Sequence, residues 1–425
     1  MFKRTLAIAA GVTLGLGLAL VATRTALAWG WFGNRELDQS TDYVREVLKL
    51  VNENYVDAKE SAYGQLTKSA LHGMVETLDP HSEFLESRDY RQVEAEMSGK
   101  FGGIGIQVEM RKGKVVVISP IAGTPGERAG ILRGDEIVRV NGLAIGKGVT
   151  MVSVIDQLRG APHTKVAIAV YRPSTGKTLD LTLEREIIKV DSVREVRVLP
   201  GGIGYIQLAE FSERSAEEFG RALDRLLQDG IDSLVLDLRN NPGGLLDAAV
   251  EVAEPFFSKG EMIVYTQGRK PSDHEEFRAE GSGDQLHLPV AVLINAGSAS
   301  AAEIVAGALK DTGRAVIIGE RSFGKGSVQS IFNLKNGEGL RLTTARYYTP
   351  SGVSIHEKGI EPQVEVVMTP DEDNKLRLQR SRFDVTDPKE FNDRFGFVPV
   401  EDRQLQAALD VLKGIKAFSG STDGP

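Results

Sequence analysis

The sequence predicts a multidomain α/β protein, α+β in its overall organisation. Residues 189–368 carry short apolar runs bounded by turns, with helical patterns between them, as in a sheet of buried strands covered by helices. Residues 97–188 instead indicate a strand-rich module, and further helical segments lie at residues 37–96 and near the C-terminus. A length of 425 residues favours two or three domains.

The composition is that of a globular, loop-rich protein, 41% hydrophobic and with 46 glycines. A formal net charge of −8 argues against a nucleic-acid partner, because such binding needs concentrated Lys and Arg. The absence of cysteine excludes disulfides, thiolate zinc sites and cysteine nucleophiles. The six histidines never fall at metal-ligand spacing, so we expect no metal and no cofactor.

The N-terminal segment, residues 1–28, is predicted to be a signal peptide or an N-terminal membrane anchor. Lys3 and Arg4 precede an apolar run at residues 5–22, and residues 26–28 form an A-x-A cleavage site. The run has about the 18 residues that a bilayer span needs, so cleavage and retention both fit. We therefore expect a protein of the periplasm, either soluble or tethered to the inner membrane. ATP is not expected in that compartment.

Residues 37–96 are predicted to form a small helical region. Apolar residues recur there at helical spacing, and they are Val44, Val47, Leu48, Val51 and Tyr55 in one stretch and Leu66, Ala70 and Met74 in another. The Asp-Pro-His-Ser sequence at residues 79–82 interrupts the pattern.

Residues 97–188 are predicted to be a module of strands with one helix. Strands are expected at residues 101–106, 114–118, 166–171 and 179–183, and the helix at residues 152–158. Residues 129–131 with residues 134–142 are expected to form a turn, a strand and another turn. This order resembles that of a PDZ domain over its whole length. The Gly-Asp-Glu-Ile-Val-Arg-Val-Asn-Gly stretch at residues 134–142 is among the more specific PDZ signatures.

Residues 189–368 are predicted to form the α/β core, and residues 369–425 a polar tail that ends in a helix. Core strands are expected at residues 203–208, 233–238, 290–294 and 315–318, and helices at residues 215–227, 246–255 and 299–309. The terminal helix at residues 403–415 is amphipathic, because Leu405, Ala408, Leu409 and Leu412 fall at i, i+3, i+4 and i+7. Its apolar face is expected either to dock on the core or to contact a second copy.

The first candidate site, Asn-Ala-Gly-Ser-Ala-Ser-Ala-Ala-Glu at residues 295–303, joins a buried strand to a helix of small and apolar residues. A serine at a helix N-terminus lies beside free N–H groups and the positive end of the dipole, which can stabilise an oxyanion. Ser300 with Glu303 also fits the S-x-x-E capping box, so a structural cap fits this stretch as well. A second serine, Ser298, leaves room for one serine to cap while Ser300 reacts.

The second candidate site, at residues 319–329, allows three interpretations. The stretch nearly matches a P-loop, but Gly326 stands where Ser or Thr would hold magnesium, and export removes the nucleotide. It contains the S-x-x-K of β-lactamases, with Ser322 as nucleophile, but lacks the companion S-D-N and K-T-G motifs. Alternatively Lys325, among glycines and apolar residues, loses its charge by desolvation and serves a serine elsewhere as general base. A solvated loop lysine is the structural alternative.

The third candidate site, at residues 237–244, is a strand end that turns into a helix. Pro242 and the paired glycines Gly243 and Gly244 can expose backbone N–H groups to an anion or oxyanion. An ordinary strand-to-helix turn fits the stretch equally. No G-x-S-x-G elbow occurs in the sequence, so an α/β-hydrolase is not expected.

In this order, and after a PDZ-like module, the three sites resemble those of the carboxyl-terminal processing peptidases, also called tail-specific proteases. The resemblance covers roughly residues 37–415, and its most specific stretches are residues 237–244, 295–311, 319–329 and 340–359. It implies a ClpP/crotonase-like protease core with an inserted PDZ domain and helical N- and C-terminal segments.

The resemblance implies a Ser-Lys catalytic pair. Ser300, the second serine of Ser-Ala-Ser-Ala, would be the nucleophile, and Lys325 of Phe-Gly-Lys-Gly the general base. Gln329, four residues later, is similar to the residue that holds the lysine in place. Ala302 stands where family members often carry a third serine, and Asp311 is expected to have a structural role.

The oxyanion donors implied by the resemblance are the Ala301 amide and one amide from Gly243 or Gly244. The PDZ-like module resembles those that capture a free C-terminus, so a peptide would add as a strand beside residues 104–108. The expected peptide-binding residues are Phe101, Gly102, Gly103, Ile104, Gly105 and Ile106, with Arg159 as a candidate coupler between the PDZ groove and the active site.

The sequence therefore predicts an exported serine endopeptidase that binds the C-terminal tails of protein substrates, preferably with small or apolar last residues. An adaptor or regulatory lipoprotein and further copies of the chain, in a dimer or larger assembly, are the other expected partners. Two alternatives stay open. One is a non-catalytic PDZ scaffold on a protease-like fold, and the other is a penicillin-interacting acyl enzyme that uses Ser322.

Overall fold

The computed structural model describes residues 35–111, 113–121, 123–146, 149–281, 285–380, 385 and 387–419. The predicted signal segment, residues 1–28, lies outside this part of the chain. None of the helices within these ranges is long and apolar enough to cross a membrane. The chain divides into two compact units, Met1–Phe84 and Leu85–Pro425.

The described part of the first unit consists mainly of two helices, α2 (Arg35–Asn54) and α3 (Tyr63–Glu76). The break that the sequence predicts at residues 79–82 is a turn held by a side chain. Asp79 Oδ1 accepts the backbone N–H groups of His81 and Ser82, each at 2.8 Å. The short strand β1 (Glu83–Leu85) follows at the boundary of the units.

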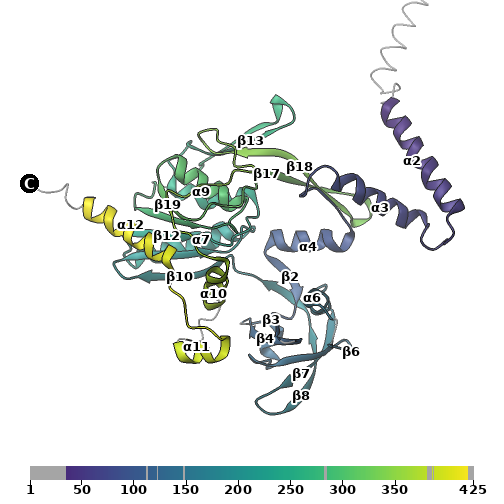
Figure 1. Cartoon of the computed structure of the whole chain (residues 1–425), viewed down its shortest axis with the longest axis horizontal. Helices are drawn as coiled ribbons and strands as arrows, with labels where there is room; N and C mark the ends of the chain where they lie inside the picture. Colours follow the sequence, from purple (N-terminus) through teal and green to yellow (C-terminus); the bar gives the residue numbers. More distant parts are fainter. Residues whose placement is uncertain are drawn as a thin grey trace, which may run out of the picture. The chain divides into compact units, whose positions relative to one another are not determined.

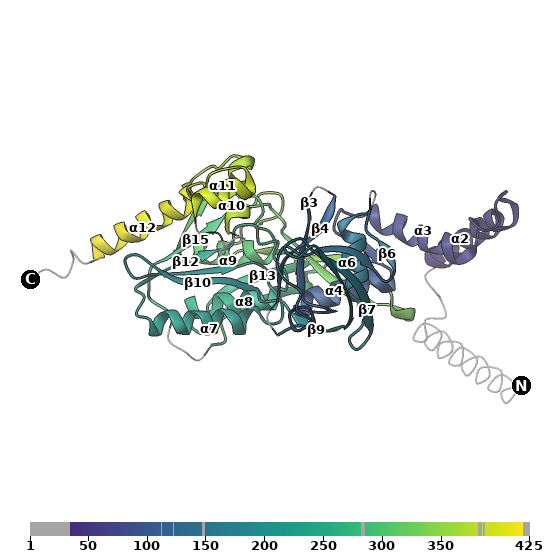
Figure 2. The same ribbon diagram turned by 90° about the horizontal axis from the view of Figure 1, so that it is seen from below.

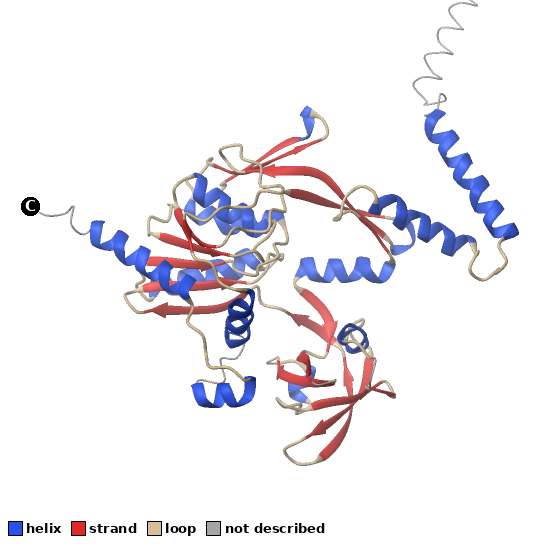
Figure 3. Cartoon of the chain, in the orientation of Figure 1, coloured by secondary structure: helices blue, strands red, loops and turns tan. Residues whose placement is uncertain are grey.

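The strand-rich module lies in the second unit, after helix α4 (Ser87–Ser98), and Figure 3 shows its strands grouped apart from those of the core. Its elements are β2 (Lys100–Gly103), β3 (Ile106–Arg111), β4 (Lys114–Pro120), α5 (Pro125–Arg128), β5 (Glu136–Val140), β6 (Leu143–Ala144), α6 (Met151–Leu158), β7 (Lys165–Arg172), β8 (Lys177–Glu184) and β9 (Glu186–Lys189). The main sheet has the order β3-β4-β5-β7-β8, and β2 pairs with β9. Apolar residues from this sheet and from α6 form a separate core.

The structure divides the strand expected at residues 101–106 into β2 and β3. Gly105 lies between them with φ of 69°, a conformation that L side chains rarely adopt. A Cβ at this position would also come within 2.3 Å of the Thr124 side chain. The glycine is therefore required by both the backbone and the packing, and the strand cannot run through it.

The core sheet has the order β10-β11-β12-β15-β16-β19, parallel from β11 onward, with β10 antiparallel at the edge. Its strands are β10 (Val193–Leu199), β11 (Ile203–Leu208), β12 (Ser233–Asp237), β15 (Val290–Ile294), β16 (Ala315–Gly319) and β19 (Val364–Glu365). Every residue of β12 and β15 is buried, as expected for continuous apolar runs covered on both faces. The predicted α/β class is confirmed.

Helices cover both faces of this sheet. One face packs against α7 (Ser215–Gln228), α8 (Leu246–Ala253) and α9 (Ala301–Asp311). The other face packs against α12 (Arg403–Ser419) through its predicted apolar stripe, so this stripe docks on the core. Figure 1 labels α7 and α12 beside these strands, and Figure 2 shows α7 and α8 on the opposite side of the strands from α12.

An antiparallel sheet and several shorter elements were not expected from the sequence. The sheet contains β13 (Met262–Gly268), β14 (His274–Arg278), β17 (Ser327–Asn333) and β18 (Gly339–Tyr348). The other elements are α10 (Pro370–Arg380) and α11 (Pro388–Phe395) in the polar tail and the 3₁₀ turns η1 (Glu254–Phe256), η2 (Pro271–Asp273) and η3 (Lys335–Gly337). Most residues of β17 and β18 are only half-buried, so they lack a strong hydrophobic signal.

Candidate active site

The three candidate sites of the sequence lie in the loops that follow β12, β15 and β16. These strands are parallel neighbours, so their carboxyl ends lie at one edge of the sheet, where open α/β folds bind ligands. One cavity of about 710 Å³ opens at this edge. Its lining includes every predicted catalytic and oxyanion residue, namely Ser300, Lys325, Gln329, Gly243, Gly244 and Ala301.

Ser300 lies at the N-terminus of α9 in a strained conformation. Its φ is 56° and its ψ −118°, which is costly for a residue other than glycine. The surrounding backbone holds the turn, because the Ala299 N–H donates to the Asn241 carbonyl at 2.9 Å. Ser300 is half-buried and lines the cavity. Strain of this kind, held in place by neighbours, is typical of functional positions.

The Ser300 hydroxyl is in contact with a buried tyrosine of β18. The Tyr347 hydroxyl donates a hydrogen bond to Ser300 Oγ at 2.8 Å. Burial, joined by the charge of Glu303, raises the pKa of Tyr347 above its usual value and outweighs the lowering effect of the Ser300 hydrogen bond. Tyr347 therefore stays protonated and serves as a donor.

Glu303 connects the serine loop to the lysine loop. Its carboxylate is fully buried and accepts the backbone N–H groups of Ser300 at 2.8 Å and Lys325 at 2.9 Å. It also accepts the Gly324 N–H at 2.7 Å and the Ser322 hydroxyl at 2.5 Å. Glu303, which the sequence predicts as the capping-box residue of α9, therefore also holds the backbone of the loop that contains Lys325.

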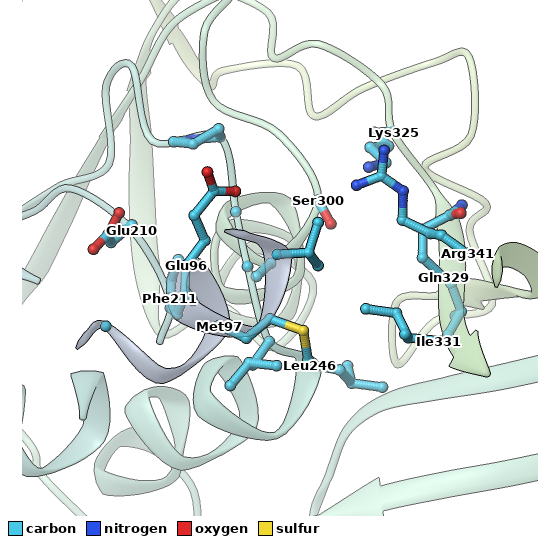
Figure 4. A pocket seen from close by; sticks show the side chains of 18 of the residues that line it. Glu96, Met97, Glu210, Phe211, Leu246, Ser300, Lys325, Gln329, Ile331 and Arg341 are labelled. Carbon is cyan, nitrogen blue, oxygen red and sulfur yellow. The ribbon is translucent and has the colours of Figure 1, made fainter. Parts of the chain in front are cut away.

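Lys325 and Gln329 come from the loop after β16 and from β17. Figure 4 shows both beside Arg341 on one wall of the cavity that contains Ser300. The Gln329 Nε2 donates to Thr343 Oγ1 at 2.8 Å and to Ser327 Oγ at 3.2 Å. Its Oε1 is buried and accepts no hydrogen bond from the part of the chain that the structure describes. This acceptor is available to a donor inside the cavity.

The paired glycines pack directly against the serine turn. A Cβ at Gly243 would lie 2.6 Å from Ser300 Cβ and 2.8 Å from the Ala301 nitrogen. Both glycines have positive φ, 95° for Gly243 and 143° for Gly244. The Gly243 N–H donates to Asn241 Oδ1 at 2.9 Å, so this amide is already engaged. Gly244 and Ala301 line the same cavity.

The remaining serines of the two loops have structural partners. Ser298 is buried and does not cap α9, contrary to the sequence expectation, because its Oγ donates to the Leu238 carbonyl and accepts the Asn295 N–H. Ser322 is 6% exposed, and its hydroxyl is held between Glu303 and the Ile360 N–H. A nucleophile must reach a substrate, so these contacts argue against the S-x-x-K interpretation.

Asp311 lies at the opposite end of α9, where its carboxylate accepts the N–H and the hydroxyl of Ser351. These contacts tie the helix to the segment after β18. They are consistent with the structural role expected for this aspartate.

A second cavity, of about 500 Å³, lies along β3 and α6 of the strand-rich module. It is lined by five of the predicted peptide-binding residues, Phe101, Gly103, Ile104, Gly105 and Ile106, and by Arg159. Gly102 packs against the chain instead, and its carbonyl accepts the Gly160 N–H at 3.0 Å. Phe101 and Arg159 also line the cavity that contains Ser300, and the Arg159 guanidinium lies 4.4 Å from the centre of the Phe101 ring.

A buried ionic network lies beneath the glycine loop, and sequence analysis missed it. Asp237, at the end of β12, is bound by Arg239 at 2.7 Å, Arg380 at 2.8 Å and the Tyr205 hydroxyl at 2.7 Å. Arg239 in turn binds Asp402 at 2.7 Å. The network thus joins the strand end to two segments of the C-terminal tail.

Tyr347 and the bridging role of Glu303 were also missed. Glu303 was singled out only as a capping residue, and its long-range partners cannot be derived from local sequence. Tyr347 lies in a stretch that carried the family resemblance, but nothing in the local pattern pairs it with a residue 47 positions earlier. The buried charges of the Asp-x-Arg pair at residues 237 and 239 were the one available signal for the network.

Comparison with known protein families gives two matches. The model of peptidase family S41 matches residues 202–366, and that of the PDZ domain matches residues 102–183. The first match contains all three loops of the cavity, and the second contains β3 and α6, which line the groove.

Individual proteins are similar over most of the chain. The carboxy-terminal-processing protease of Bartonella bacilliformis is 40% identical over 372 residues, which are 86% of this chain and 83% of that protein. A protein of Staphylococcus aureus named "Probable CtpA-like serine protease" is 37% identical over 79% of this chain, which spans 66% of that protein. The solved photosystem II D1 C-terminal processing protease has 32% sequence identity and a TM-score of 0.44, covering 76% of this chain and 91% of that one.

Proposed function

Because the chain belongs to the carboxy-terminal-processing serine proteases of peptidase family S41, we propose that Ser300 is its nucleophile and Lys325 its general base. The observation that carries this proposal is the Glu303 carboxylate, which binds the backbone N–H groups of both residues at one cavity. A structural cap would need only the first of these contacts. The second fixes the lysine loop against the serine turn.

The proposed reaction is acyl transfer through a covalent intermediate. Neutral Lys325 takes the proton of Ser300 Oγ, which attacks the peptide carbonyl carbon, and the lysine returns the proton to the leaving amine. Water then hydrolyses the acyl-enzyme with Lys325 as base again. Gln329 Oε1, which is buried and accepts no hydrogen bond from the described residues, is the group that we propose to orient the lysine.

The oxyanion of the tetrahedral intermediate is proposed to bind the amides of Gly244 and Ala301. Ala301 is the first residue of α9, so its N–H lies at the positive end of the helix dipole. Engagement of the Gly243 N–H by Asn241 favours Gly244 as the second donor. Gly243 then serves to allow close packing against Ser300.

Substrate recognition is proposed to use the groove along β3. An extended C-terminal tail would add as a strand beside β3, with its last side chain in the apolar groove against α6. Arg159 lines this groove and the cavity of Ser300, so it is the residue that we propose to couple the two. The apolar run and A-x-A site at the N-terminus support an exported enzyme that acts in the periplasm.

The test of the proposed nucleophile is covalent labelling. A fluorophosphonate probe is expected to modify Ser300, and mass spectrometry of the digested protein identifies the labelled serine. The Ser300→Ala variant is expected to take up no label and to leave an unfolded protein substrate uncleaved. Label on Ser322 would instead favour the S-x-x-K alternative, and cleavage by the Ser300→Ala variant would contradict the proposal.

The test of tail recognition uses two peptides that differ only at the C-terminus. Amidation of the terminal carboxylate is expected to lower kcat/KM by about 10- to 100-fold, the value of one hydrogen bond to a charged group. The fluorophosphonate labelling rate, which needs no tail, is the control and should not change. Equal cleavage of the free and amidated peptides would count against capture of the C-terminus.

A further inference from the structure

The tyrosine beside the nucleophile has a role that packing alone does not explain. We propose that Tyr347 is a further catalytic residue, whose hydroxyl donates a hydrogen bond to Ser300 Oγ while that oxygen gains and loses its bond to the substrate carbon. The inference rests on the proposed function, since it requires Ser300 as the nucleophile. Besides Lys325 and the oxyanion amides, the Tyr347 hydroxyl would then be a third group of the protein that contacts the reacting atoms.

The position of the Tyr347 hydroxyl is fixed by its strand and by its burial. Tyr347 is 2% exposed, and its ring belongs to the core cluster that also contains the apolar residues of α9. Its N–H donates to the Gly326 carbonyl at 3.1 Å, next to Lys325 in the chain, and it pairs with Thr266 of β13. The hydroxyl is thus the end of a rigid group that reaches Ser300 Oγ at 2.8 Å.

The direction of this hydrogen bond suits the proposed chemistry. A serine hydroxyl has one proton to donate and two lone pairs that accept. Because Tyr347 is the donor, the proton of Ser300 remains available to the general base. The raised pKa of Tyr347 keeps its hydroxyl protonated, so it does not compete with Lys325 for the serine proton.

The bond changes of each step then leave Tyr347 unchanged. In acylation the Oγ–H bond breaks, the proton passes to Lys325 Nζ, and Oγ bonds to the carbonyl carbon while the amine leaves with a proton from Lys325. In deacylation water gives a proton to Lys325 Nζ and attacks the ester carbon, the bond between that carbon and Oγ breaks, and the departing Oγ, which carries negative charge, takes the proton from Lys325. Tyr347 keeps its own proton throughout and stabilises the charge on Oγ in both steps, as an oxyanion donor does.

The experiment compares two adjacent tyrosines. Tyr347→Phe removes the hydroxyl at Ser300, and Tyr348→Phe removes one on the opposite face of the same strand, where Tyr348 stacks on Tyr265 at 5.0 Å between ring centres. Loss of one preorganised donor is expected to slow fluorophosphonate labelling of the full chain by about 100-fold in Tyr347→Phe. Tyr348→Phe is expected to label at the wild-type rate.

Peptide cleavage gives a second readout. Because the hydroxyl contacts the nucleophile and not the substrate, Tyr347→Phe is expected to lower kcat and leave KM near that of the wild type. Labelling of Tyr347→Phe at the wild-type rate would overturn the inference while leaving the proposed function intact. Labelling or cleavage by Ser300→Ala would instead overturn the proposed function, so the two failures are distinguishable.

A variant that keeps the packing covers the case in which Tyr347→Phe does not fold. Site-specific replacement of Tyr347 by 3-fluorotyrosine retains the ring and the hydroxyl but makes the phenol a stronger donor. A higher labelling rate than that of wild type supports the inference. A rate equal to or below that of wild type contradicts it.

Discussion

Replacement of Lys325 by alanine or by arginine is expected to lower kcat/KM for peptide cleavage by about 10⁴-fold, the upper range for loss of a general base. Arginine is the informative change, because it keeps the positive charge but its guanidinium cannot be deprotonated in proteins. Lysine must be neutral to take the proton of Ser300, and arginine cannot become so. The rate is measured with an unfolded protein substrate at saturating and limiting concentrations.

Controls separate loss of the base from loss of structure. Lys358→Ala removes a solvent-exposed lysine of the segment that packs on the same loop, and it should retain wild-type activity. Methylamine in the buffer is expected to restore part of the activity of Lys325→Ala, since a small amine can occupy the vacated position, but not that of Ser300→Ala. If Lys325→Arg cleaved at a rate close to wild type, Lys325 would not be the base.

The sequence signal for the core was strong because its strands are buried on both faces. The runs predicted at residues 203–208 and 290–294 coincide with β11 and β15, where almost every residue is apolar. The helix expected from Ala299 begins instead at Ala301, since the two preceding residues form the strained turn of the nucleophile. Burial of the core strands leaves a clear hydrophobic pattern in the sequence, whereas the strained turn at Ser300 leaves none.

The elements that were missed take their stability from distant partners. Most positions of β18 are half-buried in one continuous run, without the alternation of a strand that has one buried face, and β18 is held by pairing with β17 and β13. α10 has one buried residue, Leu376, so its sequence has no apolar face to predict a helix. Tertiary contacts determine the secondary structure of such segments, and these contacts cannot be read from a single sequence.

The sequence could predict the three loops of the candidate site, but not that they line one cavity. Each loop had a structural alternative, and for Ser300 that alternative was the capping box with Glu303. The structure shows that this contact and the contact to Lys325 belong to the same carboxylate, so capping and catalysis are not alternatives here. The parallel order of β12, β15 and β16 brings the three loops to one edge of the sheet, and the sequence alone does not reveal this order.

The largest effect on stability is expected from the buried pair beneath the glycine loop. Arg239→Met keeps a side chain of similar length but removes the charge that compensates Asp237 and Asp402. Breaking a buried ion pair from one side is expected to lower the free energy of unfolding by about 3–5 kcal/mol. Urea denaturation followed by circular dichroism measures the change, and Arg377→Met, an exposed arginine of α10, is the matched control.

The pH dependence of this difference gives a sharper test. Burial alone would raise the pKa of Asp237, but the charges of Arg239 and Arg380 outweigh it and hold the pKa below its usual value. A depressed carboxylate pKa stabilises the fold above the unfolded-state value of about 3.9, and this stability is lost as the pH falls toward the folded-state pKa. The stability gap between wild type and Arg239→Met is therefore expected to narrow below about pH 4. A gap that stays constant from neutral pH to pH 3 would show that the lost stability came from packing, because packing carries no proton linkage.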